Sequence, residues 1–432
     1  MTRKTRGAAA AAIGLGIALV ATGCAGNGDD SGADSSTSGG KVTLSVWENA
    51  TTGPGAQYWK DAAAAFQKAH PNVTVKIQAI QNEDFDGKLQ TALNSNSAPD
   101  VFMQRGGGKM QAMVEADELK AIDLDSASKA AAGAALAGDT IDGTVYAVPQ
   151  DTQPEGIYYS KDLFQKAGIT STPTTVDELK ADVAKLKGIG VAPIAVGAKD
   201  AWPAAHWYYN FALRECSRDT ITKVAKTLKF TDGCWTKAGE DVADLLKVDP
   251  FEQGFLTTPA QTGAGSSAGL LANHKAAMEL MGNWEPGVVA GLTPDKKPLP
   301  DLGWFPFPAV SGGKGDPSAL MAGGGGMSVS KNAPQEAVDF VEFLLTTDQQ
   351  KAYAKAFDSI PVNKDAQSVV TESYNVSSLQ AFNKAAYTVD FLDTEYGQNV
   401  GNALNTAVVN LLAGKGSASD IVKDTNAAAA KG

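Results

Sequence analysis

Beyond residue 41, the spacing of apolar positions switches repeatedly between two periods. Residues 42–46 alternate apolar and polar side chains, which predicts a strand. Residues 56–69 carry Trp59, Ala63 and Phe66 at helical spacing, and residues 73–80 return to the strand pattern. A polar helical stretch over 83–95 then leads to a short strand at 101–103. This alternation predicts a parallel sheet whose strands are connected by helices.

The pattern begins again after residue 150. A new strand is predicted at 156–159, a helix after Pro173, and an apolar strand at 191–197, while residues 334–357 have strong helical periodicity. Residues 149–152 are a plausible first crossing between two lobes. We therefore expect an α/β protein with two lobes.

Polar and aromatic side chains follow the predicted parallel strands. Ligands of open α/β sheets bind at the carboxyl ends of the strands, so these positions are candidate ligand contacts. In the first lobe they are Trp47, Glu48, Asn49, Gln81, Glu83, Gln104 and Arg105.

The first 23 residues have the features of a secretion signal. Three basic residues precede an apolar run over residues 7–21, which is shorter than the roughly 20 residues that span a bilayer. The sequence Ala-Thr-Gly-Cys at 21–24 resembles the cleavage site of bacterial lipoproteins, which predicts that Cys24 is lipidated. Ordinary signal cleavage, with Cys24 left as a free thiol, is the alternative. Residues 24–40 are rich in Gly, Ser and Asp, as expected of a flexible tether.

The charge and the cysteines fit an exported protein. The formal net charge is -11, and removing the three basic residues of the signal leaves -14, which argues against nucleic acid as the main partner. Cys216 and Cys234 lie eighteen residues apart and predict a local disulfide worth roughly 3 kcal/mol. The three histidines have no metal-ligand spacing, so no metal or other cofactor is expected.

Four segments, at 97–101, 156–179, 273–284 and 327–362, resemble a known family. They are similar to the extracellular solute-binding proteins of bacterial ABC importers, in the carbohydrate-binding group that includes maltose-binding protein. One departure is Val176, where the family usually has Trp.

The resemblance implies a two-lobed periplasmic-binding-protein fold with a ligand cleft between the lobes. The expected first lobe is 41–150 plus about 303–352, and the expected second lobe is 151–302 plus about 353–432. It further implies a sugar ligand, partner permease subunits, a monomer, and no enzymatic activity. The lipid anchor would hold the protein at the outer face of the cell membrane.

A sugar site needs flat rings for C–H faces and directed donors and acceptors for hydroxyl groups. The resemblance places Asp100, Gln153, Asp200, Trp202, Trp284 and Tyr396 at ligand positions. The full set of predicted ligand residues is Trp47, Glu48, Asn49, Asp100, Gln104, Arg105, Asp151, Gln153, Asp200, Trp202, Trp284, Glu285 and Tyr396.

Other interpretations stay open at this point. Trp202 and Trp284 could be packing residues, and Asp100 could cap the turn before its strand. The ligand could be a non-sugar solute such as a peptide or polyamine. A secreted carbohydrate hydrolase could use two carboxylates, such as Asp151 and Glu285, as acid and base.

Overall fold

The computed structural model describes residues 40–431 apart from 96 and 324. The predicted signal, the lipidation site at Cys24 and residues up to 39 of the tether lie outside the described residues. Residues 41–432 form one compact unit.

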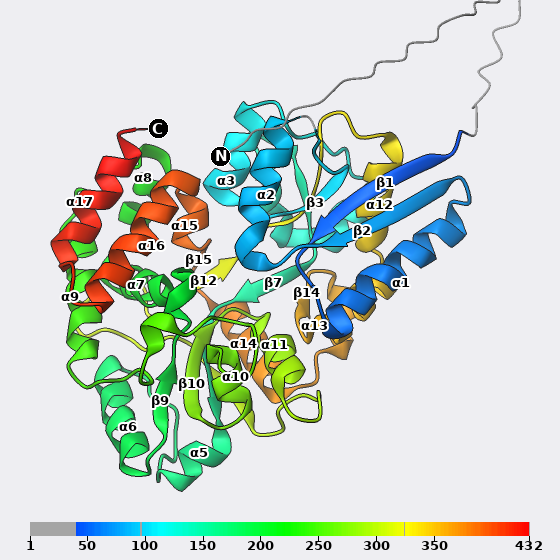
Figure 1. Ribbon diagram of the computed structural model, residues 1–432. Coiled ribbons are helices and arrows are strands. Elements are labelled where there is room, and N and C mark those ends of the chain that lie inside the picture. The colour runs from blue at the N-terminus through cyan, green and yellow to red at the C-terminus, as the bar shows by residue number, and fades with distance from the viewer. Residues whose placement is uncertain (1–39, 96, 324, 432) are drawn as a thin grey trace, which may run out of the picture. The chain divides into compact units, whose positions relative to one another are not determined.

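The first sheet has five strands in the order β2-β1-β3-β13-β6 (Figure 1). Strands β1, β2 and β3 are parallel, while β13 is antiparallel to both β3 and β6. The predicted alternation of strands and helices in this part of the chain is confirmed. The strands are β1 (Val42–Glu48), β2 (Val73–Ala79), β3 (Val101–Gln104), β6 (Ala147–Pro149) and β13 (Gly326–Val329).

Helices on both faces complete this first lobe. Leu44 and Val46 of β1 pack into a core with Phe66 on one face, while Phe85 and Leu89 pack on the other face. The helices are α1 (Gly53–Ala69), α2 (Asn82–Asn94), α3 (Gly107–Glu115), α4 (Ser126–Ala132), α12 (Gln335–Leu344) and α13 (Thr347–Phe357). A small hairpin of β4 (Thr140–Ile141) and β5 (Thr144–Val145) precedes β6.

The second sheet has four strands in the order β11-β8-β10-β9. They are β8 (Gly156–Ser160), β9 (Ala192–Ala195), β10 (Ala276–Met281) and β11 (Leu302–Phe305). The helices of this second lobe that precede β11 are α5 (Lys161–Lys166), α6 (Val176–Gly188), α7 (Trp202–Glu215), α8 (Arg218–Thr227), α9 (Cys234–Leu246), α10 (Ser267–Ala272) and α11 (Glu285–Leu292).

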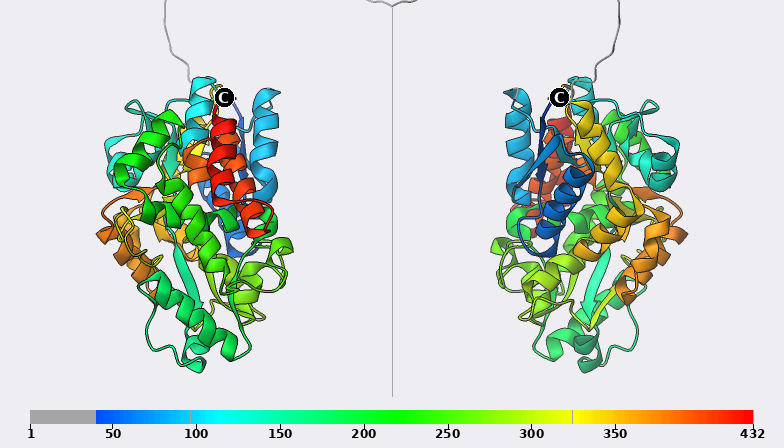
Figure 2. Two further views of the ribbon diagram at one scale, coloured as in Figure 1. Left: turned by 90° about the vertical axis from the view of Figure 1, so that its left-hand side faces the viewer. Right: turned by 90° about the vertical axis from the view of Figure 1, so that its right-hand side faces the viewer.

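Four helices lie in the C-terminal part of the chain; α14 contacts β11 of the second sheet, and α15 contacts both α16 and α3 of the first lobe. Helices α16 and α17 run side by side against α7 and α9 (Figure 2). The four helices are α14 (Ser373–Lys384), α15 (Leu392–Glu395), α16 (Gln398–Leu412) and α17 (Ala418–Ala429).

A third sheet of short strands carries the chain between the two lobes. Its order is β14-β7-β12-β15, and its strands are β7 (Asp151–Pro154), β12 (Leu320–Gly323), β14 (Ile360–Pro361) and β15 (Thr388–Val389). Strand β7 follows directly on β6 of the first sheet and leads into β8 of the second. The chain thus passes from the first sheet to the third between β6 and β7, at residues 149–151.

The return crossing differs from the expectation. Residues 302–305, expected where the chain re-enters the first lobe, form β11 and pair with β8 in the second sheet. The chain returns between β12 and β13, at residues 320–326. A short apolar strand does not encode its pairing partner, so its sequence alone could not assign it to a lobe.

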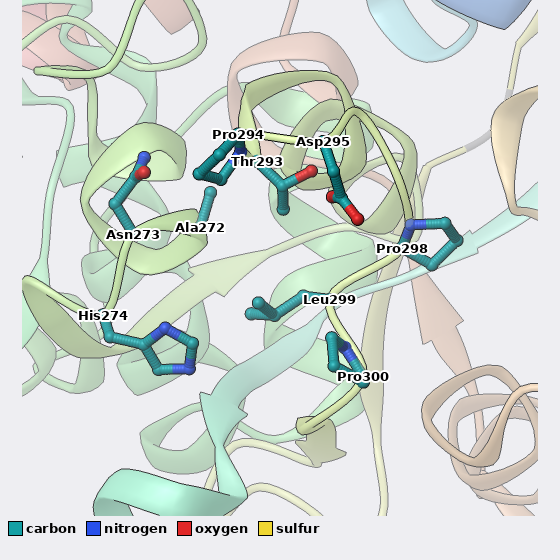
Figure 3. Close-up of a pocket in the computed structure, with 9 residues that line it drawn as sticks. All are labelled: Ala272, Asn273, His274, Thr293, Pro294, Asp295, Pro298, Leu299 and Pro300. Atoms are coloured by element: carbon teal, nitrogen blue, oxygen red, sulfur yellow. The ribbon is translucent and has the colours of Figure 1, made fainter.

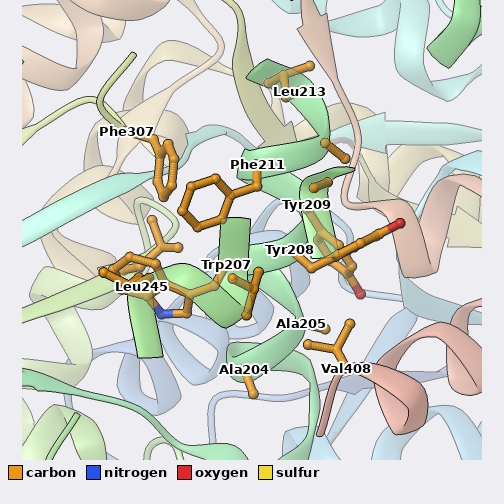
Figure 4. Packing of buried hydrophobic residues seen from close by; sticks show 14 of the residues in the cluster. Ala204, Ala205, Trp207, Tyr208, Tyr209, Phe211, Leu213, Leu245, Phe307 and Val408 are labelled. Carbon is orange, nitrogen blue, oxygen red and sulfur yellow. The ribbon is translucent and has the colours of Figure 1, made fainter. Parts of the chain in front are cut away.

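Helix α7 forms the centre of the second-lobe core (Figure 4). Every residue of the helix after Trp202 is buried, including the polar side chains of His206, Asn210 and Arg214, which lie four residues apart on one face. Phe307 packs edge-on against Phe211, with ring centroids 5.1 Å apart. The predicted disulfide between Cys216 and Cys234 is present and joins the end of α7 to the first residue of α9.

One buried charge fastens the chain after β11 to α7. Arg214 donates hydrogen bonds to the backbone carbonyls of Phe307 (2.8 Å), Ala319 (2.9 Å) and Pro308 (3.3 Å). Its side chain is buried, so each of these carbonyls depends on the guanidinium for a partner. The clamp holds the segment that leads into the return crossing.

We predict that Arg214→Met lowers the free energy of unfolding by about 3 kcal/mol, because it leaves buried carbonyls without donors. Arg218→Met is the matched control. Arg218 is exposed and its guanidinium lies 5.1 Å from the ring centroid of Tyr387, so its loss should cost under about 1 kcal/mol. Urea denaturation followed by circular dichroism measures both, and equal losses would contradict the clamp.

Candidate ligand-binding site

Three aromatic rings from distant parts of the chain meet beside the crossing strands. Trp202 is the first residue of α7, Trp284 precedes α11, and Phe391 precedes α15. The ring centroids of Trp202 and Trp284 lie 6.1 Å apart, and those of Trp284 and Phe391 lie 5.5 Å apart. We call these three residues the ring cluster. The structure thus brings together the two tryptophans that the sequence singled out and adds a phenylalanine that it did not.

The backbone before Trp202 is unusual. Ala201 has a φ of 65°, a conformation that non-glycine residues adopt at a cost and that often marks functional sites. The loop is also fixed by Asp200, whose Oδ2 accepts a hydrogen bond of 2.7 Å from the backbone N–H of Ala260. One oxygen of the predicted ligand residue Asp200 therefore holds the turn that positions Trp202.

Both tryptophans have an unpaired donor. The indole Nε1 atoms of Trp202 and Trp284 are buried and have no hydrogen-bond acceptor among the described residues, although both side chains are half-buried. A buried donor without an acceptor costs about 1–3 kcal/mol. The same is true of Trp235 and Trp304, which lie in the core, so the unpaired donors do not by themselves distinguish the ring cluster.

A buried polar group lies behind the rings. His206, one turn after Trp202 on α7, stacks on Phe391 with centroids 4.7 Å apart and planes 7° from parallel. Its Nδ1 is hydrogen-bonded to Glu155 Oε1, and Asn210 Nδ2 donates to Glu155 Oε2 over 2.6 Å. Sequence reasoning missed these residues, although the spacing of Trp202 and His206 by four places them on one face of a helix.

The crossing strands place polar groups at the same point. Gln153 of β7 donates from Nε2 to Asp151 Oδ1 over 3.1 Å. A Cβ atom on Gly323 of β12 would lie 2.6 Å from Gln153 Oε1 and 2.7 Å from the ring of Phe391. Only glycine at 323 therefore lets Gln153 and Phe391 approach each other across β12. Asp151 is buried, and burial raises its pKa to about 7.

Two of the predicted first-lobe residues share one partner at the start of α2. Asn49 Nδ2 and Arg105 Nη2 both donate to Asn82 Oδ1, over 3.2 Å and 2.9 Å. Arg105 Nε also donates to Asp86 Oδ1 over 3.1 Å. Burial acts to raise the pKa of Asp86, but Arg105 and Lys109 together hold it well below its usual value. This network is polar and only partly exposed.

The other predicted polar residues of the first lobe are engaged within the fold. Asp100 Oδ2 accepts hydrogen bonds from Ser45 N (2.8 Å) and Ser45 Oγ (2.7 Å), which ties β3 to β1. Gln104 is buried and accepts from its own next residue through Oε1. Glu48 is also buried, which raises its pKa to about 7, and it accepts from the backbone of Ala50. These contacts favour the structural interpretation for Asp100.

Two predicted ligand residues lie away from any ligand surface. Tyr396 is buried in the second-lobe core, edge-on to Phe230 with centroids 5.1 Å apart, so it is not part of the ring cluster. Glu285 follows Trp284 in sequence, but its carboxyl group is fully buried and faces Glu279 of β10. Trp284 is partly exposed whereas Glu285, the next residue and the first of α11, is fully buried, and the order of residues in the sequence does not reveal this difference.

A cavity of about 270 Å³ lies elsewhere in the second lobe (Figure 3). Pro294, Pro298 and Pro300 contribute to its wall, and His274 lies at one edge. The imidazole of His274 contacts both carboxylate oxygens of Asp301 at 3.0 Å. None of the predicted ligand residues lines this cavity.

Comparison with known proteins decides the family. Residues 49–351, well over half of the chain, match the bacterial extracellular solute-binding proteins. The chain belongs to this family. Because the family consists of solute-binding proteins, the hydrolase interpretation is not supported, and an extracytoplasmic location follows.

Individual relatives agree over most of their lengths. The melibiose/raffinose/stachyose-binding protein MelE of Bacillus subtilis is 26% identical, covering 79% of this chain and 77% of its own. The diacetylchitobiose-binding protein DasA of Streptomyces coelicolor is 26% identical, covering 82% of each. A structure from work on xylan utilization by Caldanaerobius polysaccharolyticus superimposes with a TM-score of 0.82, at 26% identity, over 89% of this chain and 99% of its own. The predicted two-lobed fold is thereby confirmed.

In this solute-binding protein, the loop that carries Trp284 is hydrogen-bonded to β14, a strand of the sheet between the lobes. Asn283 is fully buried; its Oδ1 accepts from the backbone N–H of Ile360 in β14 over 2.9 Å, and its Nδ2 donates to Asn375 Oδ1 over 2.7 Å. The residue before Trp284 is therefore hydrogen-bonded to a strand of the sheet that joins the lobes. Among the described residues, no helix is long and apolar enough to cross a bilayer.

The buried carboxyl pair beneath the ring cluster should make the stability of the solute-binding protein depend on pH. Burial raises the pKa of Glu279 to about 8 and also raises that of Glu285. A raised pKa means that the folded state retains a proton that the unfolded state loses first. This contribution to stability is therefore complete below about pH 4.5 and is lost as the pH rises to about 8.

In the wild type the free energy of unfolding should decrease between pH 5 and pH 8. We predict that Glu279→Gln makes this decrease smaller by about 3 kcal/mol. The exposed Glu115→Gln is the control and should leave the profile unchanged. Urea denaturation across this pH range measures the effect, and parallel profiles for wild type and Glu279→Gln would refute it.

Proposed function

We propose that the chain is the solute-binding component of an ABC importer and that its solute is a sugar, most simply an oligosaccharide. The observation that carries the proposal is the ring cluster, in which two partly exposed tryptophans from separate segments lie 6.1 Å apart beside the crossing strands. The names of the relatives MelE and DasA state that these proteins bind melibiose, raffinose and stachyose, and diacetylchitobiose, which supports the choice of ligand.

The chemistry of the ring cluster suits a sugar in two ways. The half-buried faces of Trp202 and Trp284 offer flat apolar surfaces for the C–H faces of a pyranose ring. Gln153 is partly exposed on the crossing strand, and its side-chain amide can both donate to and accept from sugar hydroxyl groups. The carboxyl groups nearest the rings, Asp151 and Glu155, are buried and already hydrogen-bonded within the protein, so they are poorly placed to bind the amines of a polyamine or peptide.

Transport would use the solute to bias the two lobes toward their closed arrangement. We assign 41–150 and 326–357 to the first lobe, and 155–319 and 362–431 to the second. A solute that contacts Trp284 on one side and the Asn49–Arg105 network on the other would favour closure by its differential contact free energy. The closed monomer would then be the form that permease subunits accept.

The N-terminus completes the proposal. Residues 1–23 would be removed as a signal, Cys24 would be lipidated with palmitate or a related chain, and the tether would hold the lobes at the outer face of the cell membrane. One lipid chain alone anchors marginally, so stable retention would require the multiple acyl chains that lipoprotein processing adds.

Isothermal titration calorimetry against mono- to tetrasaccharides tests the ligand. We expect saturable binding of at least one oligosaccharide, and Trp284→Ala should weaken it at least tenfold because a stacking surface is lost. Trp59→Phe alters a first-lobe core tryptophan and should keep the affinity within about twofold. The sugar proposal fails if no saccharide of the panel binds the wild-type protein.

Membrane fractionation tests the anchor. Wild-type protein should appear in the detergent phase of cells that process lipoproteins, whereas Cys24→Ser should be released to the medium or periplasm. Ala25→Ser preserves the acceptor thiol and should remain in the membrane fraction. Mass spectrometry of mature wild-type protein showing an unmodified Cys24 would reject lipidation.

A further inference from the structure

A groove of about 590 Å³ runs along one side of α2 in the first lobe. Its volume lies within the range of roughly 300–1,000 Å³ typical of small-molecule sites. Its lining includes Trp47, Glu83, Gly87, Lys88, Thr91 and Ser97. The ring cluster contributes no residue to it, so the groove is a separate surface.

The floor of the groove is an aromatic ring that the strand pattern places there. Residues 44 and 46 of β1 face the core formed with α1, so Trp47 faces the opposite side, toward α2. Trp47 is only half-buried. Phe85 and Leu89 are large side chains that α2 buries against the sheet, and β2 is the edge strand beside β1. The part of the Trp47 side chain that they leave uncovered lines the groove.

A glycine in the middle of α2 keeps the space above this ring open. Positions 83, 87 and 91 lie one turn apart on the groove side of the helix. Glycine inside a helix costs about 1 kcal/mol relative to alanine. Yet a Cβ atom at Gly87 would meet no atom within 4 Å, and the backbone of Gly87 is not in the left-handed region. Neither packing nor backbone conformation therefore requires glycine here.

The groove begins beside the polar network of the first lobe. Glu83 follows Asn82, which accepts hydrogen bonds from Asn49 and Arg105. From Glu83 the groove follows α2 to Ser95, twelve residues further, or about 18 Å at the rise of an α-helix. An elongated ligand with one end at Asn49, Asn82 and Arg105 could therefore extend along the groove beside α2.

We propose that this groove is an outer subsite for the part of a saccharide chain that extends beyond the ring cluster. The inference rests on the proposed function. Trp47 offers a stacking face, and carboxylate, ammonium and hydroxyl groups along α2 offer partners for sugar hydroxyls. An anionic ligand is disfavoured, because Lys88 is paired with Asp84 at 3.2 Å and Glu83 adds a further negative charge, and an uncharged saccharide meets no such repulsion.

A protein partner fits this surface less well. Interface cores are built from several apolar or aromatic anchors, whereas Trp47 and Ala92 are the apolar side chains that line the groove. The rest of the lining is charged, hydroxylated or glycine.

The test compares ligand lengths by calorimetry. The probes are xylo-oligosaccharides, chito-oligosaccharides and the series melibiose, raffinose and stachyose. Trp47→Ala removes the stacking face and Gly87→Trp fills the groove from an exposed helical position. Gly188→Trp is the matched control. Gly188 is also an exposed glycine in a helix, α6, and a Cβ atom added to it would also meet no atom within 4 Å.

We expect Trp47→Ala and Gly87→Trp each to weaken the longest bound member of a series at least tenfold and the shortest by less than twofold, while Gly188→Trp changes neither. Losses that are equal at all lengths, or absent, overturn the outer subsite while leaving the proposed function standing. Absence of binding by every saccharide to the wild type overturns both.

Discussion

The meeting of three rings at the crossing strands is the contact on which the rest of the structure depends. Trp202, Trp284 and Phe391 come from segments separated by some eighty to two hundred residues, and each is fixed by a different part of the scaffold. The positive φ of Ala201 directs Trp202, the bonds of Asn283 direct Trp284, and β15 precedes Phe391. Loss of any one support would move a ring without unfolding a lobe.

The same region couples a ligand to motion between the lobes. Gln153 lies on β7, Gly323 on β12 and the partner of Asn283 on β14, so three crossing segments contact the ring cluster or its supporting loop. A solute that orders these side chains would bias the crossings directly.

Sequence reasoning predicted the local elements well, because the periods of two and 3.6 in β1, α1, β2 and α2 are strong signals. It also predicted the disulfide, and it singled out Trp202 and Trp284, whose rings the structure places 6.1 Å apart. It failed where information is non-local. The pairing partner of β11, the inward direction of Glu285 and the burial of Tyr396 in the C-terminal core each depend on a contact far away in the sequence. Phe391 and Glu155 were missed because an isolated Phe or Glu carries no motif, whereas His206 was within reach through its spacing from Trp202.

The central claim is that a bound sugar changes the arrangement of the two lobes. Double electron–electron resonance between spin labels on the two lobes tests it most directly. Labels at Lys68→Cys on α1 and Lys166→Cys on α5, both exposed, would report the interlobe distance in a Cys24→Ser background. The account predicts that a saturating sugar shifts and narrows the distance distribution, and that Trp284→Ala prevents the shift at the same sugar concentration. An identical distribution with and without bound sugar would contradict it.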